Sequence, residues 1–293
     1  MNRVFEYDEL SSSKNEILSQ LHDYGFIIVR GVPGVTDVVR NFRRAARAFI
    51  DLPTDLKNQC TPKNFYAYGW SYGEEIFNGQ RDSFKGSYYA DLPENDQNVW
   101  PDFTTDAFDS EEFKESYLNV GKLVSETGKE ILRVIGHPLP GYQIKMRMLH
   151  YGAVTAENDD SSPYWCGSHR DHGQFTGLIP DLYLSNNEVI DKPEGTGLHI
   201  RGEPVTIPDD CLAFQVGEVL ELISNGEVVA TEHDVRKAMG CDRMTFATFI
   251  SPLDDYVIES DNETNDRYRP GITFKEYGDA SYAKYYGGAT NTK

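Results

Sequence analysis

The feature that most constrains the fold is a series of short β-type runs that fills the chain after Pro140. Residues 142–151 alternate between apolar and polar side chains, which is the pattern of a strand with one buried face. Turn residues such as Asp209 with Asp210 separate the runs that come later. These later runs cover residues 175–184, 197–200, 204–207, 211–216, 227–232 and 243–250. Many short strands punctuated by turns predict an antiparallel sandwich or barrel.

The first half of the chain shows helical spacing instead. Three helices are predicted there: one between the serines at 11–13 and Gly25, one from near Asp37 to Pro53, and one from a cap at Ser110 to Gly136. A short apolar strand at 26–29 follows the first helix, and the aromatic, glycine-rich residues 64–86 are predicted to be loop. Residues 274–286 are predicted to form a helix and a tyrosine-rich tail. We therefore expect one compact unit, mainly β, with flanking helices.

The excess of acidic residues limits which kinds of molecule the protein is expected to bind. The 293 residues include 28 Lys and Arg against 47 Asp and Glu, which gives a formal net charge of −19. A surface this acidic repels phosphate backbones and anionic lipids, so we expect neither nucleic acid nor a membrane as partner. No stretch is long and apolar enough to span a bilayer, and residues 1–8 lack the apolar run of a signal peptide.

The spacing of the cysteines gives no sign of a metal-binding or redox-active pair. No two of them have the spacing of a zinc ribbon or a redox dithiol. The four are Cys60, Cys166, Cys211 and Cys241. We expect four reduced thiols in a cytoplasmic protein.

A candidate metal site begins in the segment 168–173. In an extended chain residues two apart point the same way, so His169 and Asp171 can direct an imidazole and a carboxylate to one point. This pair alone is weak evidence, and His233, at the end of another predicted strand, supplies a candidate third ligand. Two histidines and one carboxylate on one face of a metal leave open positions, as in non-haem Fe(II) oxygenases.

A candidate anion site lies ten residues beyond His233. Arg243 and Thr245 share a face of a predicted strand, and the apolar flank 244–250 favours a buried position over a surface salt bridge. A buried guanidinium requires an anion, and a bound carboxylate would serve. The planar fork of Arg243, with a hydroxyl beside it, suits such a ligand.

At this point the sequence resembles the 2-oxoglutarate-dependent Fe(II) oxygenases of the isopenicillin N synthase-like type. Residues 169–176, HRDHGQFT, are similar to the family's HTDxGxLT, and residues 231–233, TEH, to its STEH. Similar segments occur in the family's order at 24–31, 82–89, 99–103, 146–151 and 217–226. The similarity extends from about residue 20 to 280, nearly the whole chain.

The resemblance implies a distorted double-stranded β-helix (jelly roll) core with a helical N-terminal region. It implies Fe(II) held by His169, Asp171 and His233. It also implies 2-oxoglutarate bound through Arg243 and Thr245, with a further hydrogen bond from Tyr151. The implied organisation is an N-terminal α/β region at 1–139, the jelly-roll core at 140–252, and a C-terminal helix and tail at 253–293.

Four departures from the family pattern matter. Thr245 replaces a serine and keeps the hydroxyl. Leu149 stands where many members have asparagine and His150 where they have tyrosine, which leaves one contact to the iron-bound end of the cosubstrate open. Glu218 replaces an aspartate, and we interpret it as a structural turn residue. His172 is not expected to be a ligand, because the zinc motif that its segment partly matches needs a histidine where Gly167 stands.

The implied reaction uses O2 and releases succinate and CO2 while a small-molecule substrate is hydroxylated, desaturated or cyclised. Family halogenases lack the carboxylate ligand, so the presence of Asp171 disfavours halogenation. One alternative is an oxidase that does not use 2-oxoglutarate, in which Arg243 and Thr245 bind the substrate's own carboxylate. A non-catalytic jelly-roll binding module is another. The aromatic residues at 65–72 and the tyrosine-rich tail could pack under loops or contact substrate.

Overall fold

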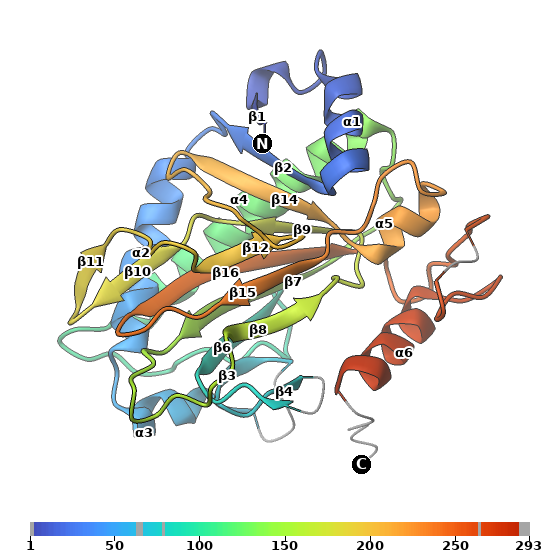
Figure 1. Ribbon diagram of the computed structural model, residues 1–293. Coiled ribbons are helices and arrows are strands. Elements are labelled where there is room, and N and C mark those ends of the chain that lie inside the picture. Colours follow the sequence, from blue (N-terminus) through green and yellow to red (C-terminus); the bar gives the residue numbers. More distant parts are fainter. Residues whose placement is uncertain (1–2, 63–66, 78–79, 263–264, 287–293) are drawn as a thin grey trace.

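The computed structural model describes residues 3–62, 67–77, 80–262 and 265–286 (Figure 1). Within these residues a large, mainly antiparallel sheet faces a smaller one across a buried interior. The main path of the large sheet runs β1 (Val4–Glu6), β2 (Phe26–Arg30), β14 (Cys211–Val216), β9 (Phe175–Leu178), β16 (Asp242–Ser251), β7 (Gln143–Tyr151), β6 (Lys85–Leu92) and β3 (Gly69–Tyr72). Off this path, β10 (Leu182–Ser185) pairs with β16 and with β11 (Glu188–Ile190).

The small sheet covers one face of the large sheet. Its order is β13 (Glu203–Pro204), β12 (Gly197–Ile200), β15 (His233–Arg236) and β8 (Tyr164–His169). Apolar side chains from both sheets meet between them, including Tyr151, Trp165 and Val235. A separate hairpin consists of β4 (Ile76–Phe77) and β5 (Gln80–Arg81). The arrangement is the one expected for a jelly-roll core.

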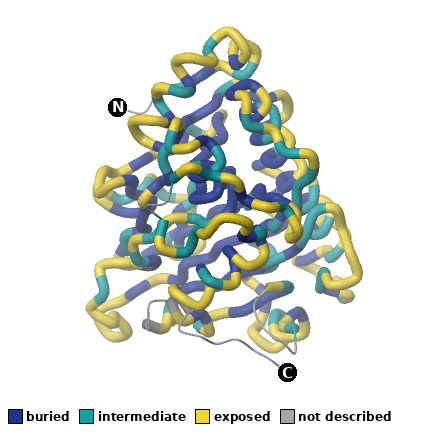
Figure 2. The backbone as a smooth tube through the Cα atoms, turned by 90° about the vertical axis from the view of Figure 1, so that its right-hand side faces the viewer, coloured by how far each residue is buried: buried dark blue, intermediate teal, exposed yellow. Residues whose placement is uncertain are grey.

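Helices α2 (Val35–Ile50) and α4 (Ser110–Ile135) cover the opposite face of the large sheet, and α1 (Lys14–Tyr24) packs on α4 and β2. The other helices are α3 (Thr54–Lys57), α5 (Glu218–Ile223) and α6 (Phe274–Tyr286), of which α6 contacts β4, and short 3-10 turns lie at Tyr7–Glu9 and Asn58–Cys60. α2 packs on α4, and α4 packs on β9 and β16. Phe42 of α2 and Tyr117 of α4 both contact Phe246 of β16. The central elements are accordingly buried (Figure 2).

Local chemistry explains the predicted helix ends. Gly25 and Gly136 adopt positive φ values of 70° and 97°, which favour glycine after the last helical turn. The N-terminal cap of α4 is Asp109 rather than the predicted Ser110, because the Asp109 carboxylate accepts hydrogen bonds from the amides of Glu111 and Glu112. All four cysteines are buried and free, as predicted.

Four other sequence predictions were wrong in detail, among them the strand at 204–207, of which only Pro204 lies in a strand, β13. The run 175–184 is two strands, because Pro180 has no amide hydrogen to donate to a ladder. Residues 227–232 are not a strand; Thr231 there donates its hydroxyl to the Gly25 carbonyl instead. The stretch 64–86 is not all loop, because β3 pairs with β6 and buries Trp70 in the core.

Two further points concern organisation. Among the residues that the structure describes, no helix is long and apolar enough to cross a membrane. The division of the chain after residues 139 and 252 stays a prediction. N-terminal strands β1, β2, β3 and β6 nevertheless belong to the same sheet as the later strands.

Candidate functional site

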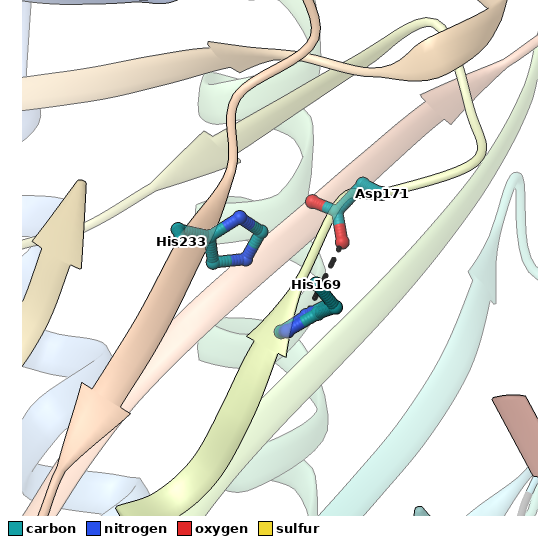
Figure 3. Close-up of side chains that lie close together, drawn as sticks. All are labelled: His169, Asp171 and His233. Carbon is teal, nitrogen blue, oxygen red and sulfur yellow. Dashed lines mark ion pairs between the residues drawn. The ribbon is translucent and has the colours of Figure 1, made fainter. Parts of the chain in front are cut away.

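Three side chains with metal-binding atoms converge at the edge of the small sheet. His169 is the last residue of β8 and His233 the first of β15, and the antiparallel register places them directly opposite each other. Their ring centroids are 4.2 Å apart. Asp171 follows β8, and one ligand atom from each of the three residues lies within 4.8 Å of the others (Figure 3). The spacing of two residues that the sequence showed thus produces one convergent cluster.

Backbone carbonyl groups orient both imidazoles. His169 Nδ1 donates to the Gly167 carbonyl at 2.8 Å, and His233 Nδ1 donates to the Thr231 carbonyl at 3.0 Å. Because Nδ1 of each ring donates to a carbonyl, Nε2 is the nitrogen that each ring can offer to a metal. His169 Nε2 lies 3.8 Å from Asp171 Oδ1 (Figure 3).

Two polar side chains hold the Asp171 carboxylate. The Thr176 hydroxyl donates to Asp171 Oδ2 at 2.6 Å, and the Gln215 amide donates to the same oxygen at 2.8 Å. The Gln215 amide also lies 3.2 Å from His233 Nε2. Gln215 is not predicted from the sequence. The one feature that could have indicated its role is the pairing of β14 with β9, which places Gln215 opposite Thr176.

The protonation states suit a divalent metal. Burial lowers the pKa of His169, and burial together with the neighbouring His169 lowers the pKa of His233 to about 4. Burial alone would raise the pKa of Asp171, but the two imidazoles and the hydrogen bonds from Thr176 and Gln215 hold it below its usual value. At neutral pH the cluster therefore offers two neutral imidazoles and one carboxylate, which are ligands for a first-row transition metal.

The predicted anion site lies on the inner face of the large sheet. Arg243 pairs with Tyr151 and Thr245 with Leu149 across β16 and β7. The guanidinium carbon of Arg243 lies 5.2 Å from the centre of the Tyr151 ring. The Thr245 hydroxyl is buried and donates to the Ile179 carbonyl at 3.2 Å. The three residues predicted from the sequence thus occupy adjacent positions.

Arg243 is buried, as predicted, with an exposed fraction of 4%. Its Nη2 donates to Asp181 Oδ1 at 2.6 Å. Among the described residues its Nε and Nη1 are buried without a partner, and so is the indole nitrogen of Trp165. Trp165 stacks on Tyr151 with ring centroids 5.4 Å apart. A buried cation with two unused donors fits an added carboxylate.

Other candidates lie outside this site. His172 contacts the rings of Phe274 and Tyr282 from α6 and does not belong to the three-residue cluster. Glu218 begins α5 rather than a turn, and it accepts a hydrogen bond from Arg267. Of the aromatic residues near the first hairpin, Trp70 is core. Phe65 and Tyr66 lie outside the described residues.

The sequence is similar to known oxygenases that use Fe(II) and 2-oxoglutarate. The model of the 2OG-Fe(II) oxygenase superfamily matches residues 144–252. Homoarginine-6-hydroxylase 2-ODD-C23.1 of Arabidopsis thaliana is 27% identical over 292 residues, covering 87% of this chain and 82% of that protein. The 2-oxoglutarate-dependent dioxygenase caaD of Aspergillus niger is 26% identical over 265 residues, covering 81% and 79%.

Solved structures confirm the predicted fold. A 2OG-Fe(II) oxygenase family protein from Caulobacter crescentus superposes with a TM-score of 0.75 at 21% identity, covering 97% of this chain and 98% of that one. A full-length Neurospora crassa protein, crystallised in complex with alpha-KG, superposes with a TM-score of 0.73 at 20% identity, covering 97% and 96%. The prediction of a jelly-roll core with an N-terminal helical region is therefore correct.

Proposed function

The chain belongs to the 2OG-Fe(II) oxygenase superfamily, and from that premise we propose which of its residues bind the cofactors and what reaction they serve. The protein is a 2-oxoglutarate-dependent Fe(II) dioxygenase, so its cofactors are Fe(II) and 2-oxoglutarate. We assign the metal to His169, Asp171 and His233. We assign 2-oxoglutarate to Arg243, Thr245 and Tyr151. The proposed reaction is hydroxylation, desaturation or cyclisation of a small molecule.

The observation that carries the metal assignment is the convergence of three ligand atoms within 4.8 Å of one another. Both imidazoles have Nδ1 committed to backbone carbonyls, so their Nε2 atoms are the ones available to the metal. Thr176 and Gln215 restrain the carboxylate of Asp171 and so fix the direction in which it donates. Three ligands on one side leave the opposite side for small ligands.

The unused donors of Arg243 carry the cosubstrate assignment. The guanidinium would bind the distal carboxylate, with Thr245 adding a hydroxyl on the same face of β16. The ring of Tyr151 lies against one face of the Arg243 guanidinium. Leu149 lies beside Thr245 and cannot hydrogen-bond, so no polar contact to the metal-bound end comes from that position.

Fe(II) and 2-oxoglutarate together supply the oxidising chemistry, in which O2 is reduced and 2-oxoglutarate becomes succinate and CO2. The chain's own part is to orient both cofactors and to exclude water from the interior. Similarity over most of the chain to a 2-oxoglutarate-dependent dioxygenase supports use of 2-oxoglutarate over an oxidase that does without it and over a non-catalytic module.

A turnover screen tests the proposal. The Fe(II)-reconstituted protein is incubated with 2-oxoglutarate and a library of small molecules, and succinate is measured. The proposal predicts substrate-dependent succinate that disappears in Arg243→Gln. Oxidation of an organic substrate that needs no 2-oxoglutarate would contradict the cosubstrate assignment, because Arg243 would then bind the substrate's carboxylate.

A further inference from the structure

We propose that Asp181 is an internal counter-ion for Arg243 that stands in for the distal carboxylate of 2-oxoglutarate when the cosubstrate is absent and weakens its binding when present. This inference rests on the proposed role of Arg243 in binding 2-oxoglutarate. Asp181 lies between β9 and β10, and its carboxylate is 13% exposed while the guanidinium side chain is 4% exposed. Their 2.6 Å contact is a charged pair inside the barrel.

The first reason is the requirement of a buried cation. A guanidinium removed from water is strongly destabilising unless an anion pairs with it. Arg243 has no other carboxylate partner among the residues that the structure describes. Before 2-oxoglutarate binds, Asp181 is therefore the group that allows Arg243 to remain inside the barrel.

The second reason is that Asp181 leaves the binding atoms unused. It takes a hydrogen from Nη2 alone, while Nε and Nη1 have no partner in the described part of the chain. A cosubstrate carboxylate can therefore bind Arg243 without first displacing Asp181. Two carboxylates then share one guanidinium, and they repel each other at short range in a poorly solvated place.

The third reason is that Asp181 is held in place. Arg43, on α2 at the outside of the sheet, donates to the backbone carbonyls of Pro180 and Asp181 at 2.9 and 3.2 Å. The other nearby cation, Lys192, donates to the Val205 carbonyl at 2.6 Å. The backbone of Asp181 is thus held in place, and among the described residues its carboxylate forms an ion pair with Arg243 rather than with Lys192. The repulsion persists in the bound state and favours exchange of 2-oxoglutarate and release of the succinate that retains the distal carboxylate.

Calorimetric titration of the Mn(II)-loaded protein tests this inference. The titrants are 2-oxoglutarate and pyruvate, which has the same metal-chelating 2-oxo acid end but no distal carboxylate. The variants are Asp181→Asn, Asp181→Glu, Arg243→Gln and, as a matched control, Asp210→Asn, which removes the charge from an exposed aspartate paired with Arg30 at 2.9 Å. The melting temperature of each variant is measured with and without 2-oxoglutarate.

The proposal predicts that Asp181→Asn binds 2-oxoglutarate roughly ten-fold more tightly, because one of two repelling carboxylates is neutral. Pyruvate affinity should change less than about two-fold, since pyruvate does not reach Arg243. Without ligand, Asp181→Asn should melt at a lower temperature than the wild type, and 2-oxoglutarate should restore most of the loss. Asp181→Glu and Asp210→Asn should bind like the wild type.

Opposite results separate two failures. If Asp181→Asn binds 2-oxoglutarate more weakly or equally, the counter-ion inference is wrong, and Asp181 only positions Arg243. If Arg243→Gln binds 2-oxoglutarate like the wild type, the proposed cosubstrate site itself is wrong. If Asp181→Asn does not fold alone, it is prepared with 2-oxoglutarate. The inference is supported if Asp181→Asn folds when 2-oxoglutarate is present, or if the double variant with Asp181→Asn and Arg243→Gln folds. It is contradicted if both of these samples remain unfolded.

Discussion

Two clusters of buried charge lie on the inner face of the large sheet, and they differ in how completely their hydrogen bonds are satisfied. In the first, Glu75 reaches from the β3–β4 connection and accepts from Arg147 at 2.6 Å, Lys85 at 2.9 Å, Ser87 at 2.8 Å and Tyr89 at 2.9 Å. Among the described residues no buried polar atom of that cluster lacks a partner. In the second, Arg243 has one carboxylate partner and two unused donors.

The difference separates a structural network from a ligand site. A buried charge is tolerated when its partners are complete, and an incomplete set marks a place where another molecule supplies the missing group. The Glu75 cluster joins the segment before β4 to β6 and β7, so it stabilises the wall of the barrel. The Arg243 guanidinium has two donor nitrogens without a partner among the described residues, and a bound carboxylate could accept from them. Charge alone would not distinguish the two.

The largest expected effect of breaking the complete network is on stability. Glu75→Gln leaves Lys85 and Arg147 buried without a full counter-charge, so we expect a loss of about 3–5 kcal/mol in the free energy of unfolding. Denaturant unfolding measures this loss. The affinity for 2-oxoglutarate should change little in whatever fraction remains folded. A variant with wild-type stability would mean that the network is not structural.

Breaking the incomplete site should affect binding more than stability. Arg243→Lys keeps the charge but loses the planar fork, so 2-oxoglutarate should bind more weakly by about 1.5–3 kcal/mol, or about 10- to 150-fold. Calorimetry on the Mn(II)-loaded protein measures it. The free energy of unfolding should fall less than in Glu75→Gln, because the lysine can still pair with Asp181. An unchanged affinity would place the carboxylate elsewhere.

A smaller effect is expected at Thr245. Thr245→Val removes the hydroxyl and keeps the shape, so the affinity for 2-oxoglutarate should fall by about 0.5–1.5 kcal/mol, or about 2- to 10-fold. Thr245→Ser keeps the hydroxyl and should bind like the wild type. The same titration compares both variants. If the two substitutions have equal effects, the hydroxyl makes no contact with the cosubstrate.

The Glu75 network should also respond to acid. Burial would raise the pKa of Glu75, but Arg147 and Lys85 hold it well below its usual value. The stabilisation from Glu75 is therefore fully present above the pKa of an unfolded glutamate, about 4.3, and is lost as the pH falls below it. The difference in unfolding free energy between wild type and Glu75→Gln should shrink from pH 6 to pH 3. A difference that grows with acid would contradict this assignment.

Residues in regular patterns were predictable from the sequence, and residues in long-range pairs were not. The His169 and Asp171 pair follows from the alternation of an extended segment, and the burial of Arg243 follows from its apolar flank. Their partners do not follow. Asp181 is 62 residues from Arg243, and Glu75 is 72 residues from Arg147. Such pairs depend on sheet register and on irregular connections, which no local pattern encodes.

The fold shows the same division. The helices and most core strands follow from periodicity and from terminating glycines. The interruption at Pro180 and the strand β3 depend on which edges are available for pairing. Gln215 was missed for a similar reason, because only the register of β14 against β9 brings it to Asp171. Pairing between distant segments therefore completes both the fold and the site.

The proposed metal site is tested most directly by Fe(II) binding under anaerobic conditions. The samples are wild type, His169→Ala, Asp171→Ala and His233→Ala, and 2-oxoglutarate turnover is measured on each. Gln174→Ala, at a buried residue outside the three proposed ligands, serves as a matched control. We predict one Fe(II) per wild-type chain and loss of both binding and turnover in each ligand variant, with the circular dichroism of the folded protein retained. Near-normal Fe(II) binding and turnover in His233→Ala would contradict the proposed ligand set, because the metal would then lie elsewhere.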